Sequence, residues 1–377
     1  MRYLHDEPSV SVLHILTDKN IGGAGRWICY LYSALRSGEF DFTAIIPTGS
    51  AIEKEMRKVG IRTIALDGIG DCSLSFLAMN ALVRKIKEIS PDIVHTHSSF
   101  VGRVAARRAG VGRIIMTKHC SDMPPRIRTI RPFNRICERL QEKYTTVAIA
   151  TSESARLSLI ADGMPREKIR VVLNGAPPLR AVSDDEKEAT RAILQIPTDA
   201  VVVGIFARIE KVKDHETFIR AAAGVCKSVD NVYFLVVGEG SLSDSMEALA
   251  AELGIADRVR FTGFVSDIAP YMSICHVNVN TSVGTETSSL AIIEGMSVGV
   301  VPVVSDLWGN TSLVLDAGLF CPKGDADSFS KMIAMLCTNR TFREIYSERS
   351  KELYNSQYKA RRFAYDISDI YRSVMKE

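Results

Sequence analysis

Short apolar runs alternate with amphipathic segments along nearly the whole chain. The runs read SVLHIL, FTAII, IRTIAL, DIVHTH, RIIMT, TVAIA and IRVVL in the first half, and VVVGIFA, VYFLVVG, VRFTGF, HVNVN and VVPVV in the second. They lack the polar alternation of a strand with one wet face, so they predict strands covered on both faces. The segments between them, such as FLAMNALVRKIKEI, carry apolar residues at helical spacing. Strands that alternate with helices predict parallel, doubly wound sheets.

The chain is long enough for two domains, because 377 residues, 46% of them hydrophobic, exceed one ordinary core. A boundary is predicted where Asn174, Gly175 and a Pro-Pro pair precede a charged helix start. We expect one Rossmann-like domain over residues 1–177 and another over 178–357. Residues 358–377 predict a final helix that either domain can accept. Such α/β domains face a central cleft at the carboxyl ends of their strands, where ligands bind.

Charge is unevenly distributed between the two halves. Residues 1–178 hold 26 Lys and Arg against 17 Asp and Glu, and the remainder holds 21 against 27. The basic half favours an anionic acceptor or an anionic membrane surface as a partner, unless the charge merely varies between domains. Arg126, Arg128, Arg131, Arg135 and Arg139 form its densest stretch, which suits anionic lipid, a phosphorylated acceptor or a solvated helix face. Aromatic residues are not interleaved with these arginines, so no nucleic-acid partner is expected.

The cysteines and the apolar runs indicate the compartment. Eight cysteines are scattered without a Cys-x-x-Cys pair, and Cys29 and Cys275 lie in apolar contexts. They predict reduced core residues in a cytoplasmic protein. The first ten residues lack the apolar core of a signal peptide. No uninterrupted apolar run approaches the ~18 residues of a membrane span, so any membrane contact is expected to be peripheral.

The N-terminal half holds two candidate ligand sites. Gly22, Gly23 and Gly25 follow the first strand and precede a helix expected at Arg26. Backbone N–H groups in such a turn can approach a phosphate, although a plain flexible turn is the alternative. Three histidines, His95, His97 and His119, stand at strand ends and could in principle bind zinc, but no acidic cluster completes a metal site. We interpret His95 as structural and His119 as a candidate site residue at the cleft edge.

The C-terminal half holds a pair of cations after its first strand. Arg208 and Lys213 span a strand-to-helix turn. Such a pair can clamp a pyrophosphate, Arg by its fork and Lys as a point charge, or the segment is simply a solvated charged loop.

A second candidate in this half is a helix start flanked by two carboxylates. Ser288 or Ser289 is the expected N-cap of an apolar helix whose N-terminus favours an anion. Glu286 precedes this helix and Glu294 lies inside it, where a carboxylate can bind the diol of a sugar or a ribose. A buried structural ion pair is the alternative for Glu294.

In this order the motifs resemble glycosyltransferase family 4, the retaining enzymes with the GT-B fold, over nearly the full length. The Gly22-Gly23 loop, the TKHCSD segment and the segment ending in Asn174-Gly175 match the family's first domain. The R-x4-K pair, VVGEGSL, VRFTGFV and the E-x7-E pair Glu286 and Glu294 match its second. The usual E-G-F-G reads Glu286-Thr287-Ser288-Ser289 here, and DLWGNTSLV lacks the Gly-Gly and the glutamate often found after PVV-x-D.

The resemblance implies a role for each of these residues. Arg208 and Lys213 hold the donor diphosphate, and Glu294 binds the ribose hydroxyls. Glu286 faces the transferred sugar, helped by the amides of Thr287, Ser288, Ser289 and Leu290 at the helix start. Gly23 approaches the phosphate or acceptor, and His119 contacts the donor sugar. The C-terminal helix crosses back onto the first domain.

The expected activity is retaining transfer of a hexose from a nucleotide diphosphate donor, a UDP-sugar, without a metal or other cofactor. The expected acceptor is an anionic, polysaccharide or lipid-linked intermediate, and the enzyme is expected in the cytoplasm or on the inner membrane face. A GDP-mannose-dependent mannosyltransferase, a nucleotide-sugar epimerase of the same fold and a non-catalytic nucleotide-sugar binder remain alternatives.

Overall fold

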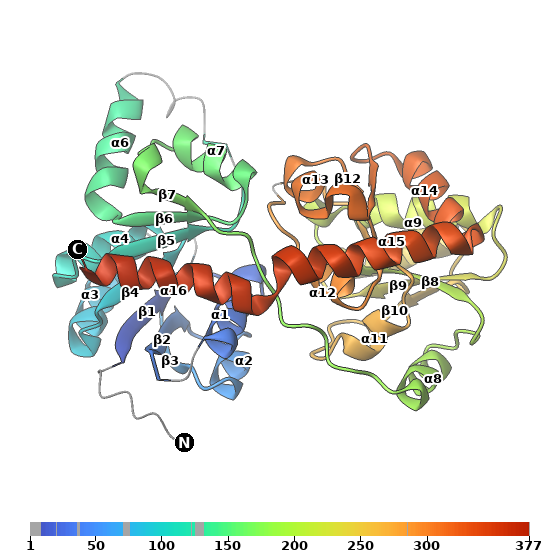
Figure 1. Cartoon of the computed structure of the whole chain (residues 1–377), viewed down its shortest axis with the longest axis horizontal. Coiled ribbons are helices and arrows are strands. Elements are labelled where there is room, and N and C mark those ends of the chain that lie inside the picture. The colour runs from blue at the N-terminus through green and yellow to red at the C-terminus, as the bar shows by residue number, and fades with distance from the viewer. Residues whose placement is uncertain are drawn as a thin grey trace. The chain divides into compact units, whose positions relative to one another are not determined.

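The structure is a computed structural model that describes residues 9–19, 21–35, 38–70, 76–121, 123–124, 132–284 and 286–376. The chain divides into two compact units, Met1–Pro177 with Ala360–Glu377, and Pro178–Lys359 (Figure 1). The first unit therefore ends at Pro177, and the chain re-enters it at Ala360 rather than at 358. At this point of return the Ala360 N–H donates to the Ala176 carbonyl at 3.1 Å, so the chain leaves and re-enters the first unit at adjacent positions.

The first unit is built on a parallel sheet of seven strands in the order β3-β2-β1-β4-β5-β6-β7. The strands are β1 (Val10–Ile15), β2 (Phe40–Pro47), β3 (Arg62–Leu66), β4 (Ile93–His97), β5 (Ile114–Lys118), β6 (Val147–Ala150) and β7 (Ile169–Val171). Successive side chains of a strand point to opposite faces. Val12 and Leu13 accordingly join different apolar clusters, so the sheet is covered on both faces, as the unbroken apolar runs predict.

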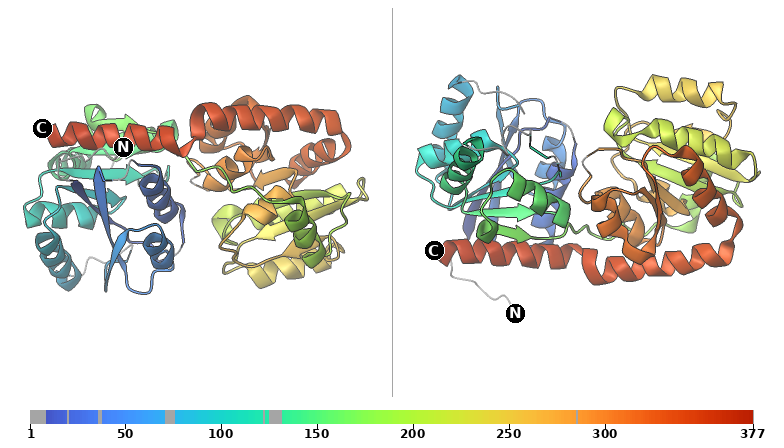
Figure 2. Two further views of the ribbon diagram at one scale, coloured as in Figure 1. Left: turned by 60° about the horizontal axis from the view of Figure 1, so that its bottom comes forward. Right: turned by 90° about the horizontal axis from the view of Figure 1, so that it is seen from above.

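Helices from both ends of the chain cover one face of this sheet. They are α1 (Gly23–Ala34), α2 (Glu53–Lys58) and α16 (Ala360–Lys376), which share a core with β1 and β2. The final helix α16 lies along this unit (Figure 2), where the Phe363 and Trp27 rings meet edge to face with centroids 4.9 Å apart. The other face carries α3 (Phe76–Ile89) and α4 (Phe100–Ala109), and α6 (Phe133–Tyr144) and α7 (Glu153–Ala161) complete the unit.

The second unit repeats this plan on a parallel sheet of six strands in the order β10-β9-β8-β11-β12-β13. The strands are β8 (Val201–Phe206), β9 (Val232–Val237), β10 (Val259–Phe261), β11 (Val277–Asn280), β12 (Val301–Ser305) and β13 (Leu319–Cys321). The last was not predicted, because three residues at a sheet edge give too short an apolar run. The helices are α8 (Asp184–Ile193), α9 (His215–Cys226), α10 (Ser243–Glu252), α11 (Ala269–Ser273), α12 (Leu290–Ser297), α13 (Trp308–Val314), α14 (Ala326–Thr338) and α15 (Arg340–Leu353).

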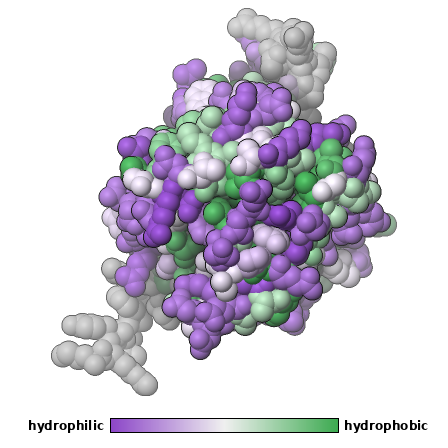
Figure 3. Space-filling view, turned by 90° about the vertical axis from the view of Figure 1, so that its right-hand side faces the viewer, coloured by the Kyte–Doolittle hydropathy of each residue, from purple (hydrophilic) through white to green (hydrophobic). Residues whose placement is uncertain are grey.

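The surface and the cysteines are those of a globular protein. Polar and charged side chains cover most of the face of the second unit that Figure 3 shows, with apolar side chains in smaller groups between them. The seven cysteines within the described residues are all unpaired thiols. Among those same residues, no helix combines the length and apolar character that a membrane crossing requires.

Each sheet changes its winding direction once. In the first unit the change falls between β1 and β4, and in the second it falls between β8 and β11. Loops leaving neighbouring strands at such a point diverge to opposite faces, and the crevice left at the carboxyl ends of the strands is the usual ligand site of this architecture.

Candidate functional site

An ion pair ties together the two loops that leave β8 and β11. The Lys213 ammonium group, at the end of a short 3₁₀ turn after β8, pairs with the Glu286 carboxylate in the segment after β11. Ser282 Oγ donates to Glu286 Oε2 at 3.0 Å. Thr281 Oγ1 donates to the backbone carbonyls of Lys213 and Asp214 at 2.9 and 2.8 Å. Lys213 and Glu286, distant in sequence, therefore form one polar cluster at the switch point of the second sheet.

The surroundings of Glu286 favour its ionised form. Burial by itself raises the pKa of this carboxyl group. The positive charge of Lys213 and hydrogen bonds from Lys213, Ser282 and Asn280 outweigh burial, so the pKa lies below its ordinary value. The sequence predicts Lys213 and Glu286 as site residues, but it does not predict that they pair with each other. It also misses Ser282 and Asn280, although both lie in the polar stretch that directly follows apolar positions of β11.

Arg208 lies in the same loop system but in a different environment. Its side chain is exposed, two residues beyond the end of β8. The loop is shaped by Gly238, which has a φ of +144°; a Cβ there would lie 2.1 Å from the Ala207 carbonyl oxygen. Only glycine allows the loop after β9 to approach the Arg208 loop this closely. The two cations that the sequence predicts as a pair therefore differ in environment: Lys213 forms an ion pair with a carboxylate, and the Arg208 side chain is exposed to solvent.

Helix α12 begins beside the ion pair. Ser289 is its N-cap residue, and its first residue, Leu290, is buried. Lys213, Ser282 and Ser289 line one narrow cavity, so the helix N-terminus and the lysine border the same space. Thr287 is buried and Ser288 is partly exposed between Glu286 and the helix. Gly309 of α13 packs so tightly on this segment that a Cβ there would lie 2.0 Å from the Glu286 carbonyl oxygen.

Glu294 lies inside α12 and is only 1% exposed. Its backbone carbonyl accepts a hydrogen bond from Ser297 Oγ at 2.6 Å, which anchors this turn of the helix. A carboxylate this deeply buried is costly unless other groups stabilise it. The structure places Glu294 in the same helix whose first turn follows Glu286, as the eight-residue spacing predicts.

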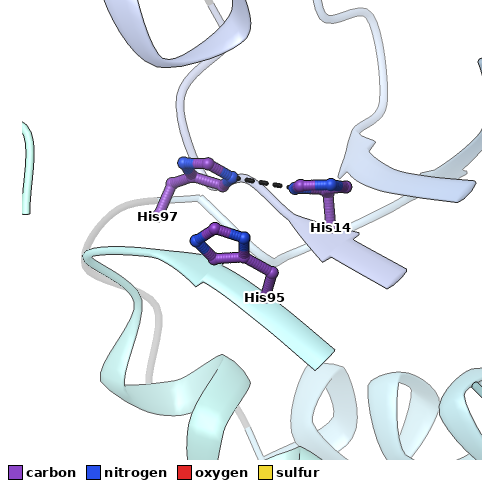
Figure 4. A group of neighbouring side chains, drawn as sticks. All are labelled: His14, His95 and His97. Atoms are coloured by element: carbon purple, nitrogen blue, oxygen red, sulfur yellow. Dashed lines mark hydrogen bonds between the residues drawn. The ribbon is translucent and has the colours of Figure 1, made fainter. Parts of the chain in front are cut away.

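The histidines of the first unit form a second polar cluster at the switch point between β1 and β4. His14 pairs with His95 in the register of the two strands, so their side chains share a face with that of His97. The ring nitrogens His14 Nδ1 and His97 Nε2 lie 3.1 Å apart (Figure 4), and His97 Nδ1 and His119 Nε2 lie 2.8 Å apart. His95 bonds at 2.7 Å to both Tyr371 Oη and Thr117 Oγ1.

Burial keeps these rings uncharged. It is the main cause that lowers the pKa of His14, His95 and His97 well below the ordinary value, and it lowers that of His119 to about 4. His14, His95 and His97 have ring nitrogens within 4.8 Å of one another. In this structure the His14 Nδ1 and His97 Nε2 atoms face each other at a hydrogen-bond distance, so the two rings are joined by a hydrogen bond. The sequence misses His14, although a histidine within an otherwise apolar strand is itself a signal.

One expectation from the sequence needs correction. Helix α1 begins at Gly23 rather than Arg26, because the helix packs through Gly25, where a Cβ would lie 2.6 Å from Ile52. Gly23 itself has open space where a side chain would be. The chain contains one Asp-x-Asp sequence, Asp325 and Asp327, in which Asp325 caps α14, its Oδ1 accepting from the Ser328 N–H at 3.0 Å. The expectation of a metal-free site stays a prediction. Of the arginine-rich stretch, Arg126, Arg128 and Arg131 lie outside the described residues, while Arg135 and Arg139 are exposed on α6.

The architecture is that of the GT-B class. HepE of Anabaena, in a crystal structure with UDP and glucose, superposes with a TM-score of 0.83 at 19% identity, covering 97% of this chain and 100% of that one. WaaG, a glycosyltransferase involved in lipopolysaccharide biosynthesis, superposes with a TM-score of 0.69 at 16% identity over 95% of this chain and 99% of its own. These likenesses show the fold, and the two doubly wound units are those of GT-B proteins.

The amino-acid sequence is similar to that of known glycosyltransferases over most of its length. Residues 21–178 match the family model Glycosyltransferase Family 4, and residues 186–353 match Glycosyl transferases group 1. The lipopolysaccharide core biosynthesis glycosyltransferase LpsE of Rhizobium meliloti is 26% identical over 345 residues, which cover 89% of this chain and 92% of LpsE. The UDP-Gal:alpha-D-GlcNAc-diphosphoundecaprenol alpha-1,3-galactosyltransferase of Escherichia coli is 24% identical over 348 residues, 85% of this chain and 86% of that protein. Together these matches support a glycosyltransferase of the family 4 type.

Proposed function

We propose that the protein is a retaining, metal-independent glycosyltransferase that moves a hexose from a UDP-sugar to a lipid-linked or polysaccharide acceptor. The observation that carries the proposal is the cluster of Lys213, Glu286 and the α12 N-terminus at the β8–β11 switch point. It combines a cation, a carboxylate and a helix N-terminus in one place. The names of the Escherichia coli relative and of the HepE complexes support a UDP-linked donor.

The cluster suits the chemistry of a diphosphate leaving group. Breaking the bond between the sugar and the diphosphate places negative charge on the phosphate, and catalysis requires that this charge be stabilised. Several positively polarised groups could stabilise this charge. They are the Lys213 ammonium group, the exposed Arg208 guanidinium group and the backbone N–H groups of Ser289 and Leu290. The Lys213–Glu286 pair holds the ammonium group in place before the donor binds. Arrival of a diphosphate would give Lys213 a second anionic partner, and Glu286 would then share the lysine and face the sugar.

The other roles follow the family resemblance. Glu294 binds the ribose hydroxyls, Gly23 approaches the phosphate or acceptor, and His119 contacts the transferred sugar. The acceptor hydroxyl attacks from the face that the diphosphate leaves, and the leaving phosphate oxygen takes up the hydroxyl proton, so the configuration is retained. Exclusion of water from the site limits hydrolysis of the donor.

Helix α6 supports a peripheral contact with an anionic membrane, where a lipid-linked acceptor would be found. Phe133, Ile136 and Leu140 recur at helical spacing and are 47%, 51% and 38% exposed. Arg135, Arg139 and Lys143 are exposed on the same helix. An amphipathic helix with an apolar stripe flanked by basic residues suits the interface of an anionic bilayer.

A ligand panel tests the donor. UDP-, GDP-, ADP- and TDP-sugars are added to the full-length protein at matched concentrations, and the midpoint of thermal unfolding is measured. A ligand at 100 times its Kd stabilises the folded state by about 2.7 kcal/mol. We expect the largest rise with a UDP-sugar. A larger rise with GDP-mannose would replace UDP by GDP in the proposal, and no rise with any of them would reject a nucleotide-sugar site.

Transfer is tested separately from binding. The donor that stabilises the protein is incubated with it in the presence and absence of lipid-linked saccharide, and products are analysed by mass and by anomeric configuration. Transfer with inversion would contradict the retaining mechanism. Conversion of the donor to its epimer would indicate the isomerase, and binding without any conversion would indicate a non-catalytic binder.

A further inference from the structure

Three histidines of the first unit form a chain of rings joined edge to edge, in which the planes of neighbouring rings differ little. The planes of His14 and His97 differ by 25° and those of His97 and His119 by 18°. The His14 and His97 ring centres are 5.4 Å apart while their facing nitrogens are 3.1 Å apart; for His97 and His119 the distances are 5.1 and 2.8 Å. In each pair the nitrogens therefore lie close to the line joining the ring centres, which is the geometry of a linear N–H···N hydrogen bond.

The chain runs from the buried strand β1 to the loop after β5. His14 is fully buried and His97 is 6% exposed. Trp27 stands edge-on to His97 and His119, with ring centres 5.3 and 5.7 Å away. The Phe42 ring lies 4.4 Å from that of His14. These neighbours fix the ring planes, so the hydrogen bonds cannot easily exchange for bonds to water.

Neutral imidazoles allow only two arrangements of hydrogens that fill both links. In the first, all three rings carry their hydrogen on Nδ1, so His14 donates to His97 and His97 donates to His119. In the second, all three carry it on Nε2, so His119 donates to His97 and His97 donates to His14. The two arrangements differ at the buried end, where His14 Nε2 is either a bare nitrogen or an N–H group.

The environment of His14 Nε2 favours the first arrangement. This atom is buried and has no hydrogen-bond partner among the described residues. A buried N–H group without an acceptor is among the rarest defects in folded proteins, and the face of a neighbouring aromatic ring such as Phe42 is only a weak acceptor. A bare ring nitrogen at this position avoids the orphaned donor.

We infer that His14 and His97 are positioning residues that hold His119 in the tautomer with its hydrogen on Nδ1. The His119 Nε2 atom accepts from His97, so Nδ1 is the nitrogen through which His119 donates. Its partner is then an acceptor oxygen, such as a sugar hydroxyl or a phosphate oxygen. The tautomer stands on the geometry of the first unit alone, and only the identity of that oxygen rests on the proposed function.

The tautomers can be measured directly. Full-length protein labelled with ¹⁵N-histidine is studied by long-range ¹H–¹⁵N correlation at neutral pH, and the His119 signals are assigned with His119→Asn. We expect the hydrogen on Nδ1 of His119 in the parent. A hydrogen on Nε2 of His119 in the parent protein would overturn the inference.

Two substitutions test the coupling. His97→Gln can keep an amide near the position of His97 Nε2, facing His14, but has no group at the position of Nδ1, so we expect His119 to gain the Nε2–H tautomer. The amide of Asn can place its nitrogen near the position of His Nδ1, so His97→Asn should keep the parent tautomer. An unchanged His119 spectrum in a folded His97→Gln protein would show that the chain of rings does not set the tautomer. If His97→Gln does not fold, the tautomer measured in the parent protein still decides the inference.

Kinetics connect the chain to the reaction. With the donor identified above, we expect His97→Gln to lower kcat about tenfold, the worth of one hydrogen bond, with little change in KM for the donor. His97→Asn should restore most of kcat. A fall in stability without a fall in kcat would assign His97 a structural role only. Failure of every nucleotide sugar to bind would reject the proposed function and leave the tautomer measurement intact.

Discussion

At the scale of single residues, the Lys213–Glu286 pair is the central feature of the candidate site. Side chains of both residues are partly exposed, at 26% and 12%. Ion pairs in water contribute little, but Ser282 and Thr281 fix the geometry here from both loops. The lysine is therefore held in one position at low entropic cost to the reaction, which is what stabilisation of a leaving group requires.

Substitution of Lys213 should affect transfer much more than folding. We expect Lys213→Ala to lower kcat by about 100-fold or more, because it removes charge that acts on the diphosphate as it leaves. Steady-state kinetics at saturating donor measure the effect, with the midpoint of thermal unfolding as the check on folding. The exposed Lys211→Ala, two residues earlier, is the matched control and should keep the parental kcat. Parental turnover by Lys213→Ala would remove the lysine from the mechanism.

The same pair should make stability depend on pH in a defined direction. The folded-state pKa of Glu286 is below its ordinary value of 4.5, so its contribution is present above that value and is lost as pH falls through the folded pKa. Urea unfolding of the parent, Lys213→Met, Glu286→Gln and the double variant yields a coupling free energy. We expect about 1–3 kcal/mol at pH 7 and a smaller value at pH 3.5. A coupling that is equal at both pH values would contradict this assignment.

At the scale of elements, α12 brings two parts of the candidate site together in eight residues. Its first turn borders the Lys213 cavity, and its second carries the buried Glu294. An apolar helix can hold a buried carboxylate in a fixed position, because the packing of its apolar side chains fixes the backbone to which the carboxylate is attached. The spacing of Glu286 and Glu294 is visible in the sequence because Glu286 stands just before this helix and Glu294 lies inside it.

Glu294 should control the affinity for nucleotide. We expect Glu294→Gln, which keeps the shape of the side chain, to weaken UDP binding by about 10- to 100-fold, because hydrogen bonds to a charged group are worth about 1.5–3 kcal/mol. Titration calorimetry measures the change, and Glu252→Gln on the exposed face of α10 serves as the control. Unchanged UDP affinity would leave Glu294 as a purely structural residue.

Helix α6 carries the prediction about membranes. Replacing Phe133, Ile136 and Leu140 together by Ser should reduce sedimentation with vesicles of phosphatidylglycerol and phosphatidylcholine, while stability changes little because the side chains are exposed. Leu77→Ser and Ile193→Ser alter side chains that are 80% and 79% exposed on other helices and should not affect sedimentation. Equal sedimentation of the triple variant and the parent would show that α6 is a solvated helix.

The sequence predicts elements better than it predicts contacts between them. Apolar runs and helical spacing locate every strand except β13, because burial on both faces leaves a clear mark on composition. The family motifs single out Lys213, Glu286 and Glu294 one by one. The pairing of Lys213 with Glu286 and the joining of His14 to His97 depend on which strands become neighbours at the switch points. That order follows from the winding of the sheet, which no local pattern encodes.

At the scale of the whole molecule, the first unit is completed by the last segment of the chain. Phe363, Ile367, Tyr371 and Val374 of α16 are at most 2% exposed and belong to the core that α1 and β1 build. Tyr371 also bonds to His95 beneath the histidine chain. The second unit, in contrast, is one continuous segment from Pro178 to Lys359. This segment supplies every described strand of its own sheet and the helices of that unit.

This asymmetry predicts how fragments behave. Residues 178–359 should fold cooperatively alone, with a single unfolding transition and a dispersed NMR spectrum. Residues 1–177 should bind an apolar dye and melt without a sharp transition, since the face that α16 covers is left open to water. Adding a peptide of residues 360–376 should restore a cooperative transition, whereas the same peptide with Ile367→Asp and Tyr371→Asp should not. A sharp transition for residues 1–177 without the peptide would mean that α16 packs onto a core that is already complete. The histidine chain would then have to be held in place by β1, β4 and α1 alone.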